Sequence, residues 1–249
     1  MNSLRIPKVI HCFWFGKGGR SEKIIRCIES WKTHSPDYRI IEWNEDSFDV
    51  NSCVYSKEAY ANKKYAFVSD YARLKVLYEY GGFYLDTDVW LLKPLDSLLN
   101  HSVFMGFESK TTVAPGLIIG AQSGNEFIGE LLSVYEHLNF VYKDRMNLTT
   151  IGEYATARLL KRGLRLNGEY QELGPVTIYP TNFFCPLERD TGHLDITPDT
   201  YSVHLYDASW KPDGYISNFK TSDFKLRLKL RLLALLGEKT FFRLIYLLR

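Results

Sequence analysis

Cysteines are few in this sequence, and it contains no long apolar run. The four cysteines, at positions 12, 27, 53 and 185, form no Cys-x-x-Cys pair and match no zinc-ligand spacing. We interpret them as buried, reduced thiols of a cytosolic protein. No stretch of about 18 apolar residues is present that would span a membrane. The first residues also lack the apolar segment of a signal peptide. These absences predict a cytoplasmic protein.

Glycine, proline and net charge are also low. With 17 glycines, 9 prolines and no sustained heptad pattern, the chain is neither collagen-like nor a coiled coil. Its formal net charge of +2 argues against a protein that binds nucleic acid by electrostatic attraction. Hydrophobic residues make up 45% of the sequence and aromatic residues 15%. This composition supports a folded core in one large domain or two small ones, and it excludes global disorder.

The basic residues are concentrated at the C-terminal end of the sequence. Residues 220–249 contain eight Lys or Arg and two acidic residues, so this segment has a net charge of +6 and residues 1–219 have −4. Leucine and aromatic residues are interleaved with the basic ones, which predicts a basic amphipathic helical tail. Such a tail is expected to contact an anionic membrane surface. The alternative is a helix pair that packs on the core.

The order of apolar segments predicts an α/β fold. A strand over 9–15, a helix over 24–31 and a strand over 38–43 predict a parallel strand–helix–strand unit. A helix over 65–80 ends at Gly81-Gly82, and a short strand follows it. The remaining segments are expected as strands (89–92, 103–107, 117–121, 176–179, 201–206) and helices (127–138, 150–160), with an irregular region over 174–219.

Asp86 and Asp88 are the most informative polar residues. They lie two positions apart after an apolar strand, so both carboxylates can leave the chain on one side. Hard oxygen ligands at the open end of a strand suit Mg²⁺ or Mn²⁺, which would in turn hold a diphosphate. The spacing alone also fits a solvated turn.

The aspartate pair is one part of a longer pattern. The chain contains, in order, Ile6-Pro7-Lys8-x-Ile10-His11-x-x-Trp14-x-Gly16, Ser69-Asp70-x-x-Arg73, Gly81-Gly82-x-Tyr84-x-Asp86-x-Asp88 and His204-x-x-x-x-Ser209-Trp210. This pattern resembles the DXD glycosyltransferases of family 32, which include bacterial capsule and polysaccharide transferases and the yeast initiating mannosyltransferases. It is also similar to the catalytic domain of the large clostridial glucosylating toxins.

The resemblance implies a GT-A type, Rossmann-like nucleotide-sugar-binding fold over 1–219. Residues 1–110 would form the nucleotide-sugar half and 111–219 the acceptor-side half with its closing loop, followed by the tail over 220–249. The implied reaction is a metal-dependent, retaining transfer of a hexose from a nucleotide sugar to a saccharide acceptor. We expect a UDP-sugar such as UDP-glucose or UDP-galactose, with GDP-mannose open. A polyprenyl-diphosphate-linked acceptor and capsular or surface polysaccharide synthesis would place the protein at the inner face of the plasma membrane.

The same resemblance assigns residues around the metal. Asp86 and Asp88 would bind Mn²⁺ or Mg²⁺, and His204 is the expected third ligand because imidazole suits Mn²⁺. Ser209 and Trp210 would close over the phosphates and exclude water. The alternative for His204 is a buried histidine whose hydrogen bonds are satisfied within the fold.

The resemblance also implies residues that contact the nucleotide-sugar donor. Asp70 and Arg73, three positions apart on one helical face, would contact the donor sugar and oppose developing negative charge. The remaining donor contacts are expected at Trp14 (stacking on the nucleobase), Asn44 and Asp46 (the ribose), and Ser69 and Tyr84. The ordinary alternatives are an ion pair for Asp70 with Arg73 and a core position for Trp14.

Two other functions stay open at this point. A non-catalytic nucleotide-sugar or glycan-binding module would bind the donor without turnover. The run Leu85-Asp86-Thr87-Asp88-Val89 also matches the signature of haloacid-dehalogenase-type phosphatases, although that motif comes near the N-terminus and needs a later acidic cluster. Residues 113–117 carry no polar side chain suited to act as a nucleophile, so retention rests on the resemblance alone.

Overall fold

The computed structural model describes residues 5–143, 145–207 and 223–247, with side chains to residue 243. Its centre is an 8-stranded mixed sheet with the order β10-β11-β5-β7-β3-β1-β2, and β6 pairs with β5 beside this path. The strands are β1 (Val9–Phe13), β2 (Arg39–Trp43), β3 (Gly82–Tyr84), β5 (Val103–Ser109), β6 (Thr112–Val113), β7 (Ile119–Ala121), β10 (Gln171–Leu173) and β11 (Val176–Tyr179).

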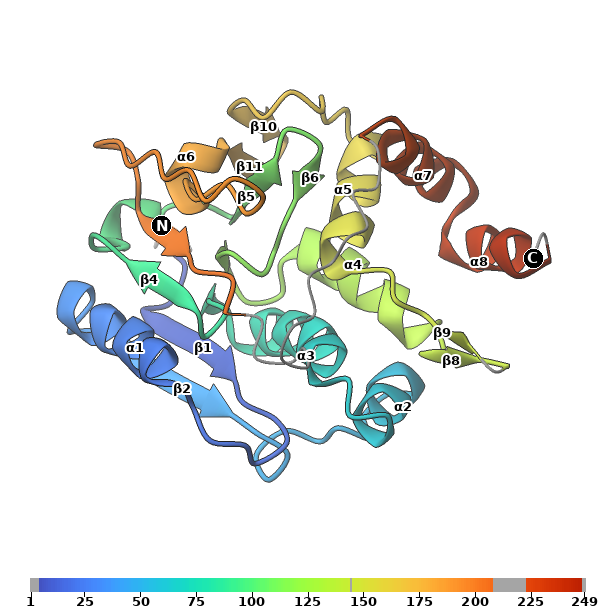
Figure 1. Ribbon diagram of the computed structural model, residues 1–249, viewed down its shortest axis with the longest axis horizontal. Helices are drawn as coiled ribbons and strands as arrows, with labels where there is room; N and C mark the ends of the chain where they lie inside the picture. The colour runs from blue at the N-terminus through green and yellow to red at the C-terminus, as the bar shows by residue number, and fades with distance from the viewer. Residues whose placement is uncertain (1–4, 144, 208–222, 248–249) are drawn as a thin grey trace.

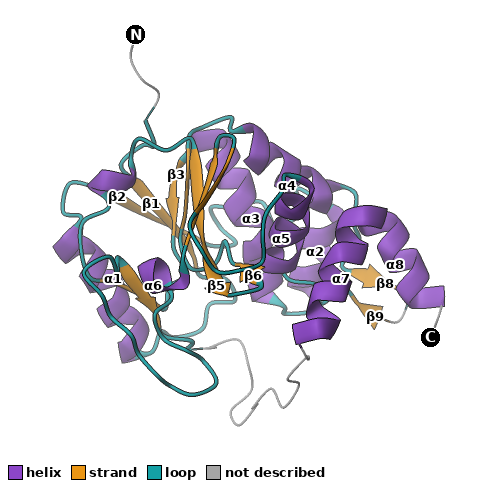
Figure 2. Ribbon diagram, turned by 90° about the horizontal axis from the view of Figure 1, so that it is seen from above, coloured by secondary structure: helices purple, strands orange, loops and turns teal. Residues whose placement is uncertain are grey.

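Helices cover both faces of this sheet (Figure 1). Figure 2 shows α3, α4 and α5 on one face, with α1 and α6 on the other. The helices are α1 (Glu22–His34), α2 (Val54–Ala61), α3 (Tyr65–Tyr80), α4 (Glu126–Glu136), α5 (Ile151–Lys161), α6 (Thr181–Phe184), α7 (Asp223–Leu236) and α8 (Glu238–Leu247), with a short 3-10 turn at Asp96–Leu98. Two apolar clusters, one on each side of the sheet, form the core. The predicted α/β fold is confirmed.

The first strand–helix–strand unit forms as its pattern predicts. β1 pairs in parallel with β2, and α1 connects them. The Ser21 hydroxyl caps α1 by accepting a hydrogen bond from the Ile24 backbone N–H. Ile24, Cys27 and Trp31 recur at helical spacing and are buried, which holds α1 against the sheet.

α3 carries the Asp70 and Arg73 positions and leads directly into β3. It ends at Gly81, which has a φ of 65°, and Gly82 follows with a φ of 107°. A Cβ on Gly81 would lie 2.7 Å from the Ser123 nitrogen, and one on Gly82 would lie 2.7 Å from the Val9 oxygen. Both positive φ angles and close packing therefore require glycine here. This turn aims β3 between β1 and β7, at the centre of the sheet.

After β3 the chain leaves the central sheet. β4 (Val89–Leu91) pairs with β12 (Ser202–His204) in a separate antiparallel two-stranded sheet. Another such sheet joins β8 (Val141–Tyr142) to β9 (Arg145–Met146). Strands at 89–91, 176–179 and 202–204 agree with the predicted strands, whereas β10 was not predicted. The division of 1–219 into two halves stays a prediction.

The C-terminal helices pack on the core through one side. Leu230 and Leu233 of α7 and Phe241 of α8 are buried. α7 lies against α5, where Lys229 donates to Glu153 at 2.6 Å (Figure 2). The Glu238 carboxylate accepts two hydrogen bonds of 2.8 Å from Arg158. Among the described residues, no helix is long and apolar enough to cross a membrane.

Candidate active site

Asp86 and Asp88 lie where the chain passes from the central sheet to the small β4–β12 sheet. The backbone N–H of Asp86 donates to the Gly116 carbonyl at 3.2 Å, and its carbonyl accepts from Val89 in a turn. The Asp88 carboxylate accepts a 2.8 Å hydrogen bond from the Asp207 backbone N–H. Both aspartates are therefore fixed by segments far from them in the sequence.

His204 joins the two aspartates to form a three-residue cluster. Its Nε2 lies 3.0 Å from Asp88 Oδ1 and 3.9 Å from Asp86 Oδ2. One potential ligand atom from each residue lies within 4.8 Å of the others. Two carboxylates and an imidazole fit Mn²⁺, because carboxylates suit hard cations and imidazole suits transition metals. The convergence of these donors supports the predicted metal ligands Asp86, Asp88 and His204.

The charges of Asp88 and His204 stabilise each other. Burial acts to raise the pKa of Asp88, but the hydrogen bond and charge of His204 outweigh it and hold that pKa below its usual value. Burial likewise acts to lower the pKa of His204, and Asp88, followed by Asp86, raises it above its usual value. The His204 Nδ1 atom is buried with no hydrogen-bond partner among the described residues. A cation that bound Nε2 would replace the proton shared with Asp88.

Asp70, Arg73, Tyr84 and Asp86 form a buried network behind the cluster. Arg73 Nη2 lies 3.0 Å from Asp70 Oδ1, and its Nη1 lies 3.4 Å from Asp86 Oδ1. The guanidinium also lies over the Tyr84 ring, 4.3 Å from its centroid, and the Tyr84 hydroxyl donates to Asp86. Arg73 Nη1 is buried and makes no hydrogen bond among the described residues. It therefore keeps a donor for a ligand.

Asp70 is almost completely buried. Burial raises its pKa to about 6, and the Arg73 charge opposes this shift. Its Oδ2 accepts a hydrogen bond from the backbone N–H of Ile151, the first residue of α5. The N-terminus of that helix therefore faces a carboxylate, which is the favourable direction for the helix dipole.

Gly116 is a site residue that the sequence analysis missed. A Cβ at this position would lie 2.6 Å from Asp86 Oδ2 and 3.1 Å from Arg73 Nη1. Segment 113–117 thus reaches the site through a glycine that packs directly against Asp86 and Arg73, and not through a polar side chain. No local signal in the sequence identifies it, because the contact depends on how this segment packs against the end of β3.

Trp14 follows β1 at the same end of the sheet and belongs to neither apolar cluster. Its indole N–H donates to the Gly18 carbonyl at 2.7 Å, and the Arg20 guanidinium lies 5.7 Å from the ring centroid. The glycine loop after Trp14 is held by Glu45, which accepts from the Gly16 backbone N–H at 3.3 Å. Glu45 is a second residue that the sequence analysis missed.

Other residues that are predicted to contact the nucleotide-sugar donor have local structural roles. The Asn44 side-chain oxygen accepts hydrogen bonds from the backbone N–H groups of Asp46 and Ser47, which forms a turn after β2. Asp46 is exposed and lies 3.9 Å from the Lys17 ammonium. The Ser69 hydroxyl donates to the Tyr65 carbonyl of its own helix. The roles of these residues at the donor stay predictions.

Ser209 and Trp210 lie outside the described residues. The segment before them is anchored to the start of α1. Lys23 donates to the Leu205 carbonyl at 2.9 Å and lies 3.5 Å from the Asp207 carboxylate. The Ser21 hydroxyl also donates to Asp207, at 3.3 Å.

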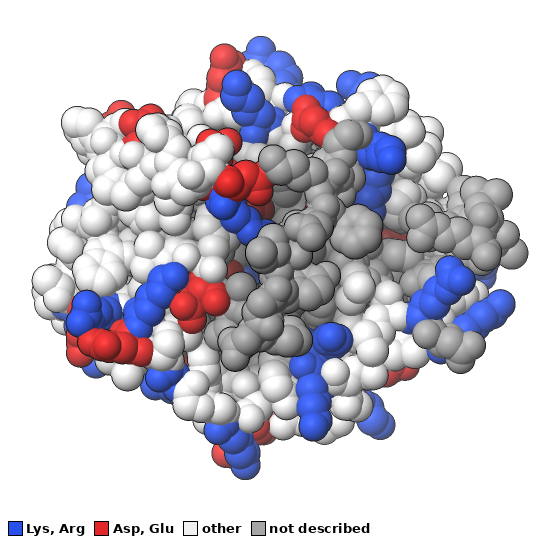
Figure 3. Space-filling model, viewed as in Figure 1, with Lys and Arg blue, Asp and Glu red and all other residues white. Residues whose placement is uncertain are grey.

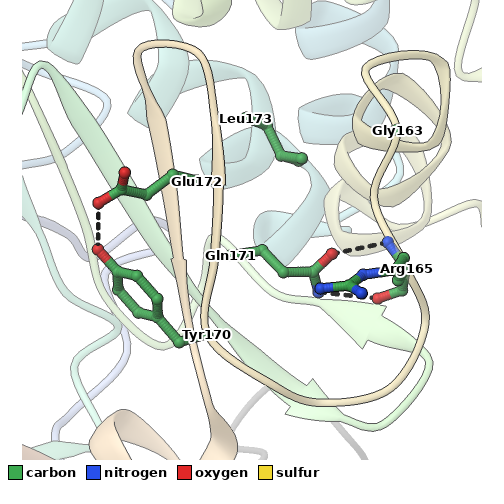
Figure 4. A pocket seen from close by; sticks show the side chains of 6 residues that line it. All are labelled: Gly163, Arg165, Tyr170, Gln171, Glu172 and Leu173. Atoms are coloured by element: carbon green, nitrogen blue, oxygen red, sulfur yellow. Dashed lines mark hydrogen bonds between the residues drawn. The ribbon is translucent and has the colours of Figure 1, made fainter.

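Two surface pockets lie apart from this cluster. One, of about 440 Å³, is lined by Gly163, Arg165, Tyr170, Gln171, Glu172 and Leu173 (Figure 4). The other, of about 510 Å³, is lined by Val9, His11, Arg39, Ile41, Trp43 and Tyr80. Within it, His11 is a buried structural residue. Its Nδ1 accepts from the Trp43 indole, its Nε2 bonds to the Gly81 carbonyl, and burial lowers its pKa to about 4.

Comparison with known proteins agrees with this geometry. Residues 21–105 match the family described as the glycosyltransferase sugar-binding region containing the DXD motif. This part of the chain is therefore similar to the DXD region of glycosyltransferases. The matched residues include Asp70, Arg73, Asp86 and Asp88, so the recognition based on the sequence motifs is confirmed.

Two curated proteins that are similar to this chain come from Schizosaccharomyces pombe. Inositol phosphoceramide mannosyltransferase 3 is 28% identical over 144 residues, which cover 56% of this chain and 40% of the relative. Inositol phosphoceramide mannosyltransferase 1 is 30% identical over 112 residues, which cover 41% of this chain and 34% of the relative. The chain therefore spans less than half the length of these relatives.

Two solved structures are also similar to the chain. The PaToxG glycosyltransferase is 25% identical with a TM-score of 0.44, over 52% of this chain and 59% of that one. A glycosyltransferase involved in the glycosylation of the major capsid of PBCV-1 is 13% identical with a TM-score of 0.46, over 80% of this chain and 94% of that one.

Proposed function

We propose that the protein is a metal-dependent glycosyltransferase that moves a hexose from a nucleotide sugar to a saccharide acceptor. The observation that carries this proposal is the convergence of Asp86, Asp88 and His204 beside the buried Asp70–Arg73 pair. The match of residues 21–105 to the DXD sugar-binding region supports it.

Each part of the site has a task in this reaction. Asp86, Asp88 and His204 would hold Mn²⁺ or Mg²⁺, which when bound neutralises charge on the leaving nucleoside diphosphate. The spare donor of Arg73 would bind the diphosphate or the donor sugar. Trp14 would stack on the nucleobase, and Ser209 and Trp210 would exclude water from the bound donor. No side chain of 113–117 offers a nucleophile, so we propose that the leaving phosphate oxygen accepts the proton of the acceptor and that configuration is retained.

The donor and acceptor are proposed by class. UDP-glucose and UDP-galactose are the candidates from the sequence resemblance, while the names of the two fission-yeast relatives favour a mannosyl donor. Those names also specify a lipid, inositol phosphoceramide, for the relatives. For this chain we propose a saccharide acceptor linked to polyprenyl diphosphate. Capsular or surface polysaccharide synthesis at the inner face of the plasma membrane is the corresponding cellular role.

The test is release of nucleoside diphosphate. The protein is incubated with UDP-glucose, UDP-galactose or GDP-mannose, with Mn²⁺ or with EDTA. We expect Mn²⁺-dependent release from one donor, accelerated by a saccharide acceptor and lost in Asp88→Asn. Donor binding without release would instead identify a binding module. Inorganic phosphate released from simple esters would identify a phosphatase.

A further inference from the structure

The face of α7 that points away from α5 carries a continuous apolar stripe. Its members follow each other at intervals of three or four residues, which places them on one side of the helix. We call this stripe the α7 ridge; it consists of Phe224, Leu228, Leu232 and Leu235, all of them exposed. Phe224 is 75% exposed and Leu235 is 80% exposed, whereas Leu230 and Leu233 on the opposite side are buried. The helix is thus apolar on two faces, and packing on α5 uses one of them.

Basic side chains border the α7 ridge on both sides. Lys225 lies three positions before Leu228 and Arg231 lies three positions after it, and both are exposed. Lys239 and Arg243 of α8 are exposed as well. The two acidic residues of these helices are already neutralised, because Asp223 pairs with Arg227 and Glu238 pairs with Arg158. The charge that surrounds the ridge is therefore positive.

The β8–β9 hairpin adds similar residues at the same end of the molecule, where Figures 1 and 2 both place it near α8. Tyr142, Met146 and Leu148 are exposed apolar side chains, and Lys143 and Arg145 are exposed basic ones. Figure 3 shows Lys and Arg side chains at this right-hand edge of the molecule.

We infer that the α7 ridge docks the protein on an anionic lipid bilayer. Apolar residues bordered by Lys and Arg are the pattern of a helix that lies in the plane of a membrane surface, with its apolar side among the acyl chains and its cations at the lipid phosphates. A second copy of the chain fits less well. A two-fold contact through the ridge would bring Arg231 and Lys225 close to the same cations of the other copy. The inference places a lipid-linked acceptor beside the enzyme, and it does not depend on the donor assigned above.

The test is co-flotation of the full chain with vesicles. Vesicles of phosphatidylcholine alone are compared with vesicles that contain about one third phosphatidylglycerol. We expect binding to the anionic vesicles and at least a fivefold weaker association when the salt concentration rises from 0.05 M to 0.5 M, about the range over which exposed charges become screened. The double substitution Phe224→Gln with Leu235→Gln is expected to reduce the bound fraction at least fivefold.

A matched control comes from a region distant in sequence. Leu194 and Ile196 are 47% and 52% exposed, so Leu194→Gln with Ile196→Gln also replaces two exposed apolar side chains, although with less exposed area than the ridge pair, and should leave flotation unchanged. Melting temperatures establish that both double variants are folded. Because Phe224 and Leu235 lie outside the metal site, donor hydrolysis by the ridge variant should equal that of the wild type.

The outcomes separate the inference from the proposed function. If the wild type does not float with anionic vesicles, or if the ridge variant floats equally well, the inference is wrong even when the protein releases nucleoside diphosphate. Concentration-dependent dimers that the ridge substitutions abolish, without vesicle binding, would show a protein interface and overturn it too. Vesicle binding by a protein inactive on all donors would contradict the proposed function alone.

Discussion

His204 Nε2 lies 3.0 Å from Asp88 Oδ1, although the two residues are far apart in the sequence. Antiparallel pairing of β12 with β4 brings them together and places His204 opposite Val89. The Asp207 backbone N–H donates a hydrogen bond to the other carboxylate oxygen of Asp88. The candidate metal cluster therefore depends on a strand pair outside the central sheet.

The first prediction concerns the metal ligands. His204→Ala and Asp88→Asn are each expected to abolish the rise in melting temperature that excess Mn²⁺ gives the wild type, because a ligand stabilises only the state that binds it. At a concentration of about 100 times the dissociation constant this stabilisation is about 2.7 kcal/mol. His193→Ala, a substitution at an exposed histidine, is the control and should keep the shift. An unchanged Mn²⁺ shift in both ligand variants would remove the metal from this site.

The second prediction concerns Gly116. Its φ is not positive, so Gly116→Ala adds no backbone strain, but the new Cβ would displace the Asp86 carboxylate and the Arg73 guanidinium. Substitution of a residue that orients metal ligands typically weakens metal binding about 10- to 100-fold. We therefore expect Mn²⁺ to bind the Gly116→Ala variant about tenfold more weakly. Mn²⁺ titration by calorimetry measures this. A Cβ on Gly19 would meet nothing within 4 Å, so Gly19→Ala should keep wild-type affinity. Equal affinities for the two variants would contradict the positioning role.

The third prediction concerns Trp14. Trp14→Ala is expected to weaken nucleotide binding by about tenfold or more, since stacking of a base on an aromatic ring contributes about 1–3 kcal/mol. Trp14 belongs to neither apolar cluster, so the melting temperature should change little. Trp14→Phe keeps a ring and should recover part of the affinity. A large loss of stability with unchanged affinity would instead assign Trp14 to the core.

The sequence predicted those features that local patterns determine. The strand–helix–strand unit at the start, the helix that carries Asp70 and Arg73, and the double glycine before Asp86 all follow from spacing and backbone freedom. Asp86 and Asp88 could be named from their spacing after a strand, whereas His204 was named from the family resemblance. Its contact with Asp88 depends on the pairing of β12 with β4, which no local pattern shows.

Features that depend on long-range packing could not be predicted in this way. Gly116 is a site residue only because its segment meets Asp86, and Glu45 only because it reaches Gly16. The alternating Leu and basic residues of 224–231 also fit a strand, and the structure has a helix there. Which leucines that helix buries is decided by α5.

The last prediction concerns the pH dependence of stability at Asp70. Its ordinary pKa of 3.8 applies to the unfolded chain, and burial raises the pKa in the folded protein to about 6. Between pH 3.8 and about pH 6, the Asp70 carboxyl is therefore protonated in the folded protein and ionised in the unfolded chain. The free energy of unfolding is then expected to fall as pH rises through this interval, by up to about 3 kcal/mol, and to stay low above pH 6.

Asp70→Asn removes this titration and should flatten that part of the profile. The free energy of unfolding of wild type and variant is measured with denaturant at pH 4 and at pH 7. EDTA is present so that metal binding does not contribute. The value of the variant is then subtracted from that of the wild type at each pH. We expect this difference to be more negative at pH 7, because the buried carboxylate is then charged. Asp195→Asn, at an exposed position, is the control and should parallel the wild type. A difference that does not change between the two pH values would mean that Arg73 and the α5 N-terminus fully compensate the burial of the Asp70 charge.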